Sequence, residues 1–134
     1  MYLSTLSEEE KVLFIGLAYN VAMADGVYCE EEKLMMESYC NEMQIMFEQE
    51  NMVKPVNDII EEMNDKCGMR EKKIFVFEAI GLAMSDNNFD ITERRIVNEM
   101  MEKFKIPEEF SVKCEQIIQE YIEFQAKIKA LVIG

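Results

Sequence analysis

Apolar residues recur every three or four positions along most of this chain, and no segment alternates convincingly as a β-strand does. The first such pattern predicts a helix that opens at a Ser7–Glu10 capping box and runs to about Ala24. A second helix is expected from about Glu30 to Gln44. The buried face of the first helix is expected to hold Val12, Ile15, Tyr19, Ala22 and Met23, and one side of the second Leu34, Met35, Ser38 and Met43.

Two further segments complete the helical pattern. In the stretch 46–68, Lys54-Pro55 marks a break, and a new apolar helical pattern then runs from Val56 to Asp65. Pro107 stands at a position typical of a first helical turn, and residues 108–131 predict a long C-terminal helix. The expected inner face of that helix consists of Phe110, Cys114, Ile117, Ile118, Tyr121, Phe124 and Ile128.

The chain matches itself after a shift of 61 residues. Residues 11–45 then fall on residues 72–106 without a gap, so that Lys11 meets Lys72 and Ala22-Met23 meets Ala83-Met84. We interpret this as a duplicated helical hairpin, with one repeat at about 8–45 and the other at about 72–106. The prediction is one all-α domain over residues 1–134, with six or seven helices and a core of pseudo-two-fold symmetry.

Each repeat contains an acidic turn between its two helices. The turns read "DGVYCEEE" and "DNNFDITE", an Asp followed seven residues later by a Glu. Gly26 supplies a residue for the left-handed conformation that stops a helix, and Asn87 takes that position in the second copy. Asp90 with Glu93 forms a capping box for the second helix of copy two, whereas copy one has Cys29, a poor cap, at the matching position.

Two interpretations of these turns remain open. Carboxylates beside the unpaired carbonyls of a helix end make an oxygen-rich corner that suits Ca²⁺ or Mg²⁺. Alternatively, the Asp binds turn amides and the Glu only completes a capping box, so that the corner is structural. An EF-hand is excluded, because Ile91 and Val97 stand where its loop needs Gly and Glu. The candidate cation ligands are Asp25, Glu32, Asp86, Glu93 and Asp90.

Charge and composition narrow the function. A net charge of −13 leaves no electrostatic footprint for nucleic acid or an anionic membrane, and favours a basic protein partner. The chain has no histidine, which removes the commonest general base and most imidazole metal sites. The four cysteines lack zinc spacing and the first residues lack a signal peptide, so we expect a reduced, cytoplasmic protein without a membrane-spanning segment. The Arg94-Arg95 doublet fits a solvated helix face.

These two turns give the chain a resemblance to the TerB-like family. An apolar helix ends in "ADG" or "SDN", and a Glu follows seven residues after the Asp, at both places. The similarity covers residues 8–106 well and the final helix loosely. It implies an all-helical, internally duplicated core, a non-enzymatic role in resistance to tellurite and other stress, and metal chelation at Asp25, Glu32, Asp86 and Glu93. Cys29 and Asn87 depart from an exact match between the copies.

The resemblance leaves three function classes to compare. The first is a TerB-like stress-response domain with a divalent cation at the turns. The second is an acidic protein-interaction scaffold whose turns are purely structural. The third, a hydrolase that uses Asp25 and Glu32 as a carboxylate pair, is disfavoured because three adjacent glutamates on an exposed first turn do not suggest the apolar cleft that such a pair needs.

Overall fold

The computed structural model describes residues 2–24, 26, 29–46, 54–85 and 89–134. Within these ranges the chain is helical and contains no strand, which confirms the predicted all-α class. The elements are the 3₁₀ turn η1 (Leu3–Thr5) and the helices α1 (Glu8–Ala22), α2 (Glu30–Met43), α3 (Val56–Lys66), α4 (Met69–Ala83), α5 (Ile91–Phe104) and α6 (Glu108–Val132).

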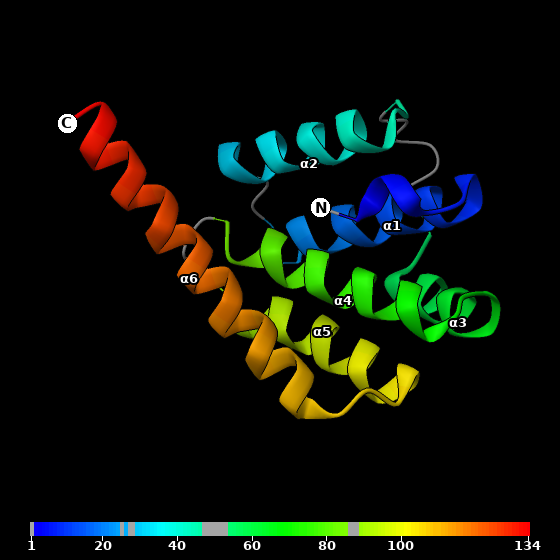
Figure 1. The fold of residues 1–134 in the computed structure, drawn as a ribbon. Coiled ribbons are helices and arrows are strands. Elements are labelled where there is room, and N and C mark those ends of the chain that lie inside the picture. Colours follow the sequence, from blue (N-terminus) through cyan, green and yellow to red (C-terminus); the bar gives the residue numbers. More distant parts are fainter. Residues whose placement is uncertain (1, 25, 27–28, 47–53, 86–88) are drawn as a thin grey trace.

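Helices α1 and α4 lie side by side at the centre of the molecule (Figure 1). Helix α1 also packs against α2 and α3, and α4 packs against α5 and α6. A helix with neighbours on several sides needs apolar residues around most of its circumference, and both central helices are built this way. The core therefore runs along the α1–α4 pair, with α2 and α5 covering it from opposite sides.

Three aromatic side chains mark the middle of this core. Phe14 of α1 and Phe75 of α4 are fully buried, and their rings stack with centroids 6.2 Å apart. Tyr39 of α2 meets Phe14 edge to face at 5.2 Å. Its hydroxyl donates a 3.0 Å hydrogen bond to the Glu78 carbonyl oxygen of α4. This contact ties the outer helix α2 to the far member of the central pair.

The element bounds of the two expected repeats correspond. Helices α1 and α4 begin and end 61 residues apart, and so do α2 and α5. Gln44 and Lys105, which follow α2 and α5, both adopt the left-handed conformation with φ of 56° and 57°. The duplication and its pseudo-two-fold symmetry remain an interpretation of the sequence.

The predicted buried faces of α1 and α2 were only partly right. On α1, Val12 and Met23 are exposed, because this helix is surrounded and its periodicity does not single out one face. On α2, Leu34 is 58% exposed and Ser38 is exposed as well. The buried stripe instead follows the inward-facing Glu32 at helical spacing, through Met36, Tyr39, Cys40 and Met43.

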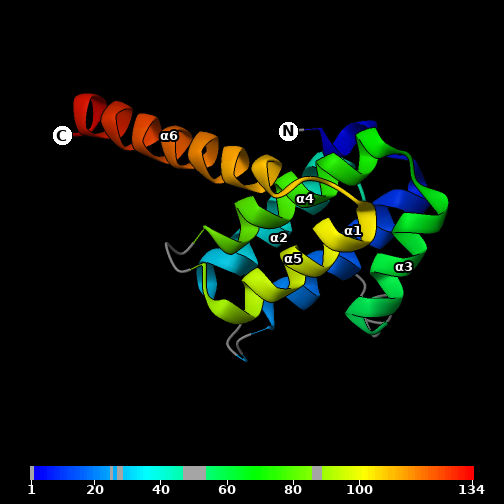
Figure 2. The ribbon, with the colours of Figure 1, turned by 90° about the horizontal axis from the view of Figure 1, so that it is seen from below.

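The expected inner face of the final helix was wrong over much of its length. Only Ser111, Cys114 and Ile118 of α6 are buried, and residues 123–134 are all exposed. A helix of 25 residues is about 37 Å long at 1.5 Å per residue. Its C-terminal part projects away from the other helices, so its apolar side chains meet none of the other described helices there (Figures 1 and 2).

Candidate functional site

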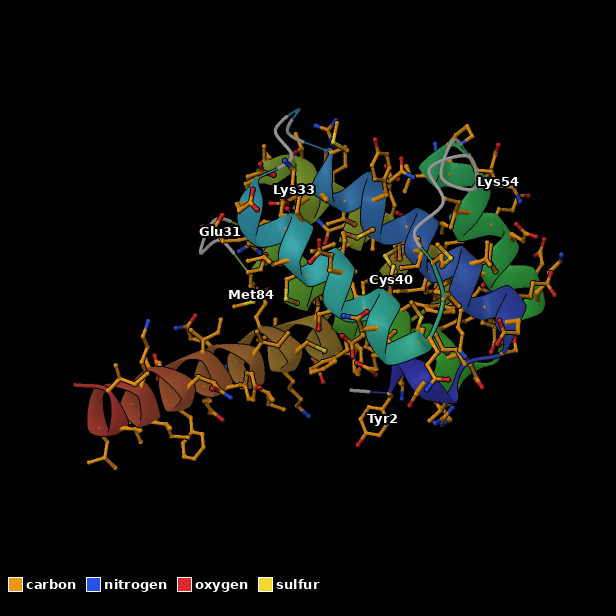
Figure 3. The ribbon with its side chains drawn as sticks, turned by 90° about the horizontal axis from the view of Figure 1, so that it is seen from above. Tyr2, Glu31, Lys33, Cys40, Lys54 and Met84 are labelled. Atoms are coloured by element: carbon orange, nitrogen blue, oxygen red, sulfur yellow. The ribbon has the colours of Figure 1, made fainter. Side chains whose placement is uncertain are left out.

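The candidate site comprises the starts of α2 and α5 and the ends of α1 and α4. Figures 1 and 2 place these helix ends on one side of the molecule. In Figure 3, Glu31 at the start of α2 and Met84, which follows α4, lie toward the same end of the helices. Asp25 and Asp86 lie outside the described residues, as do Tyr28 and Asn87. The other three candidate ligands, Glu32, Asp90 and Glu93, belong to the described residues.

Asp90 and Glu93 cap the start of α5, as the sequence predicted. Asp90 Oδ1 accepts the Glu93 backbone N–H at 2.9 Å and the Thr92 hydroxyl at 2.6 Å. Glu93 Oε1 in turn accepts the Asp90 backbone N–H at 3.2 Å. The hydrogen bond from Thr92, with the backbone bond from Glu93, holds the pKa of Asp90 below its ordinary value. Both carboxylates are thus used by the helix that they begin.

The matching position at the start of α2 is built from Glu32 and Cys29. Glu32 Oε1 accepts the Cys29 backbone N–H at 3.1 Å, as Glu93 does for Asp90. Glu32 and Glu93 are each only 2% exposed. The Cys29 side chain takes the place of the Asp90 carboxylate. Burial, helped by contact with Glu32, raises the pKa of its thiol to about 11. The two capping boxes therefore share their Glu and differ in the residue that faces the N3 amide.

Arg94 has a role that the sequence did not reveal. Its guanidinium carbon lies 4.1 Å from the centroid of the Phe89 ring, and its Nε donates a 3.1 Å hydrogen bond to the Phe89 carbonyl oxygen. Its Nη2 also pairs with Glu115 Oε1 of α6 at 3.2 Å. Arg94 therefore connects the entry to α5 with α6, while Arg95 is exposed as predicted. The contact with Phe89 is local, whereas only tertiary packing brings Arg94 to Glu115, so that part of its role could have been indicated only by an expectation of α5–α6 contact.

Gly26 adopts the left-handed conformation that the sequence predicted, with φ of 80°. It lies farther from the helix than expected, because α1 ends at Ala22 and its C-cap is Met23. The Gly26 N–H donates a 3.0 Å hydrogen bond to the Met23 carbonyl oxygen. One carbonyl at the end of α1 is thereby paired within the turn itself.

The described residues do not hold a ready-made metal centre. Among them, no three His, Cys, Asp or Glu side chains form a group that could bind a metal ion. Glu32, Asp90 and Glu93 thus form no such centre within the described part of the chain, and the contributions of Asp25 and Asp86 lie outside it.

The thiols are poorly suited to nucleophilic chemistry. Burial raises the pKa of Cys67 and of Cys114 to about 11, and nearby carboxylates add to the effect. Burial also raises the pKa of Cys40. The thiolate is the reactive form of cysteine, and a raised pKa keeps these thiols protonated at neutral pH. Cys40 lines the hollow of about 530 Å³ beside α2, together with Lys33 and Glu37.

In the described residues the chain is all-helical, and two buried glutamates, Glu32 and Glu93, cap the starts of α2 and α5. Comparison with protein-family models gives no match, and comparisons with curated proteins and with solved structures give none either. The TerB-like resemblance therefore rests on the two turn motifs alone. Along the described ranges, no helix combines the length and the apolar character needed to cross a membrane.

Proposed function

We propose that this chain is a non-enzymatic, cytoplasmic interaction domain of TerB-like type that serves a stress response by binding a basic protein surface. The observation that carries the proposal is that some acidic side chains cap helices while others are exposed and free of that role. Glu32, Asp90 and Glu93 cap helices, whereas Glu30, Glu31 and Glu37 are exposed along the outer helix α2. With a net charge of −13, the exposed acids favour encounter with a cationic partner.

The same geometry argues against an enzyme. The carboxylate of Glu32, one half of the pair that a hydrolase would need, accepts a backbone N–H and is almost completely buried. A general acid or base must reach a substrate proton, and a carboxylate used as a cap cannot do so without releasing the start of α2. The cysteines, with raised thiol pKa values, offer no activated alternative.

A defined basic probe tests the interaction proposal. We expect a lysine-rich peptide to bind the chain with an affinity that falls as salt rises from 50 to 500 mM, because salt screens exposed charges. The variant Glu30→Gln/Glu31→Gln/Glu37→Gln should weaken binding about tenfold. Asp58→Asn/Glu61→Gln/Asp65→Asn on α3 removes the same charge from another exposed face and should weaken it about twofold or less. Fluorescence anisotropy with a labelled peptide measures both.

Equal losses in the two variants would show that only net charge matters and that α2 is no binding face. Absence of binding at 50 mM salt would overturn the interaction proposal itself. Circular dichroism of each variant checks that the helices remain, since all six substituted side chains are exposed.

A second candidate function is cation binding at the two acidic turns, as the TerB-like resemblance implies. It is favoured by the arrangement of α1 and α4, which end on the same side of the molecule (Figure 1). The negative ends of two helix dipoles therefore face that side. Such a site would draw on Asp25 and Asp86 beside the last carbonyls of these helices, with Ca²⁺ or Mg²⁺ as the expected ion.

Calorimetric titration of chelator-treated protein with Ca²⁺, Mg²⁺ and Mn²⁺ tests this second function. We expect binding below millimolar concentration that is lost in Asp25→Asn/Asp86→Asn, because each substitution removes an anionic oxygen ligand. The same substitution at Asp58 and Asp65 is the control. Binding that survives in the turn variant, or parent protein that takes up no ion below millimolar, would overturn it.

A further inference from the structure

From its packed base to its projecting end, α6 carries an apolar stripe on its exposed surface. Ile117, Phe124 and Leu131 are 57%, 60% and 86% exposed, and Tyr121 and Ile128 between them are exposed as well. These five residues follow one another at intervals of four, three, four and three. That spacing is the a/d seam of a coiled coil, in which each side chain needs a facing helix to cover it.

We propose that this stripe is a self-association surface, on which α6 of a second copy packs antiparallel. In an antiparallel pair, each a-position side chain meets a d-position side chain of the other helix. Tyr121 of one copy then packs against Phe124 of the other, and Ile117 against Ile128. The stripe is complementary to itself in this register, as a two-fold dimer requires.

Charges beside the stripe select the antiparallel direction. Glu120 and Lys127 occupy successive g positions, and the register just described places Glu120 of one copy beside Lys127 of the other. Two-fold symmetry forms this ion pair twice. A parallel pair would place Glu120 beside Gln125 and Lys127 beside Val132, so that neither charge gains a partner.

A hollow at the base of α6 fits the end of the incoming helix. The hollow measures about 380 Å³ and is lined by Phe77 of α4, by Phe110, Cys114 and Ile117 of α6, and by Tyr2, which Figure 3 labels. The antiparallel register sets Leu131 of the second copy opposite Cys114, beside this hollow. Leu131 is the most exposed side chain of the stripe, and this arrangement gives it an apolar site.

The oligomeric state of the full chain tests the proposal. Light scattering after size exclusion at about 50 µM should give twice the 15.7 kDa mass of one chain. Phe124→Asp should return the chain to one copy without loss of helix, because Phe124 is exposed in the single copy. A chain that stays single at 100 µM, or a dimer that Phe124→Asp leaves intact, would overturn the proposal and assign the stripe to another protein.

Charge reversal tests the antiparallel register separately. Glu120→Lys and Lys127→Glu should each raise the dimer dissociation constant about tenfold, since each sets like charges side by side. The double reversal should return it to within about threefold of the parent. Glu123→Lys makes the same charge change away from the g positions and should move the constant by less than threefold. A double reversal as weak as the single ones would overturn the antiparallel arrangement.

Discussion

Replacing Phe14 with alanine is expected to lower the free energy of unfolding by about 3–5 kcal/mol, which is a large part of what a chain of this size has. The side chain is fully buried between the central helices. The substitution removes the contacts of the Phe14 ring with two other rings, the stacked Phe75 and the edge-to-face Tyr39. Because Tyr39 also holds α2 to α4 through its hydroxyl, the cavity would loosen the joint between three helices.

Equilibrium unfolding in urea, followed by circular dichroism, measures this loss. Phe14→Leu keeps much of the volume and should cost less than half as much. Leu34→Ala is the surface control: it removes an apolar side chain from α2 that is mostly exposed, and should change stability by no more than about 0.5 kcal/mol. If Phe14→Ala costs no more than Leu34→Ala, the α1–α4 pair is not the centre of the core.

The helices could be predicted because the residues that begin and end them lie close together in the sequence. Ser7 with Glu10 and Asp90 with Glu93 form the expected capping boxes, and both depend on residues three positions apart. The faces of the helices could not be predicted equally well. Which side of α1 is buried depends on how many neighbours surround it, and Val12 is exposed in a helix that is apolar nearly all round.

The final helix shows that a clear apolar face does not have to be buried in the same chain. Its stripe of Ile117, Tyr121, Phe124 and Ile128 is a clear apolar face, and the sequence alone reads it as a core face. The structure leaves these side chains exposed because α6 runs away from the helices that it packs against at its base. Amphipathic periodicity indicates that a face needs a partner, but it does not say whether that partner is the same chain.

In the candidate site, the capping pairs could be predicted from the sequence, but the burial of their glutamates could not. The spacing of Asp90 and Glu93 indicates the cap, yet nothing local shows that Glu93 and Glu32 are both 2% exposed. Burial of a capping Glu depends on what covers the start of the helix from outside. The same holds for Arg94, whose contact with Glu115 joins positions that are distant in the sequence.

Replacing Glu93 with alanine should lower the free energy of unfolding by about 1–3 kcal/mol, because it removes a buried side chain and leaves a partly buried donor without its acceptor. The Asp90 N–H would lose the oxygen that now accepts it at 3.2 Å. Glu93→Gln keeps one acceptor oxygen that can face the Asp90 N–H and replaces the other oxygen, with the charge, by an NH2 group, so it should restore most of that stability. Urea unfolding of both variants gives the two values, and Glu99→Ala on the exposed face of α5 is the control.

The Gln variant separates a cap from a cation ligand. A glutamate that acts as a cap needs an acceptor oxygen, which Gln supplies, whereas a hard divalent cation gains most from the carboxylate charge. If Glu93 is a cap alone, Glu93→Gln should keep the parent's stability within about 1 kcal/mol and should leave the response of its melting temperature to 5 mM Ca²⁺ unchanged. A parent that Ca²⁺ stabilises, next to a Gln variant that Ca²⁺ does not, would contradict the capping role and make Glu93 a ligand. The buried position of Glu93 favours the first outcome, because its carboxylate already accepts the Asp90 backbone N–H and faces little solvent from which an ion could enter.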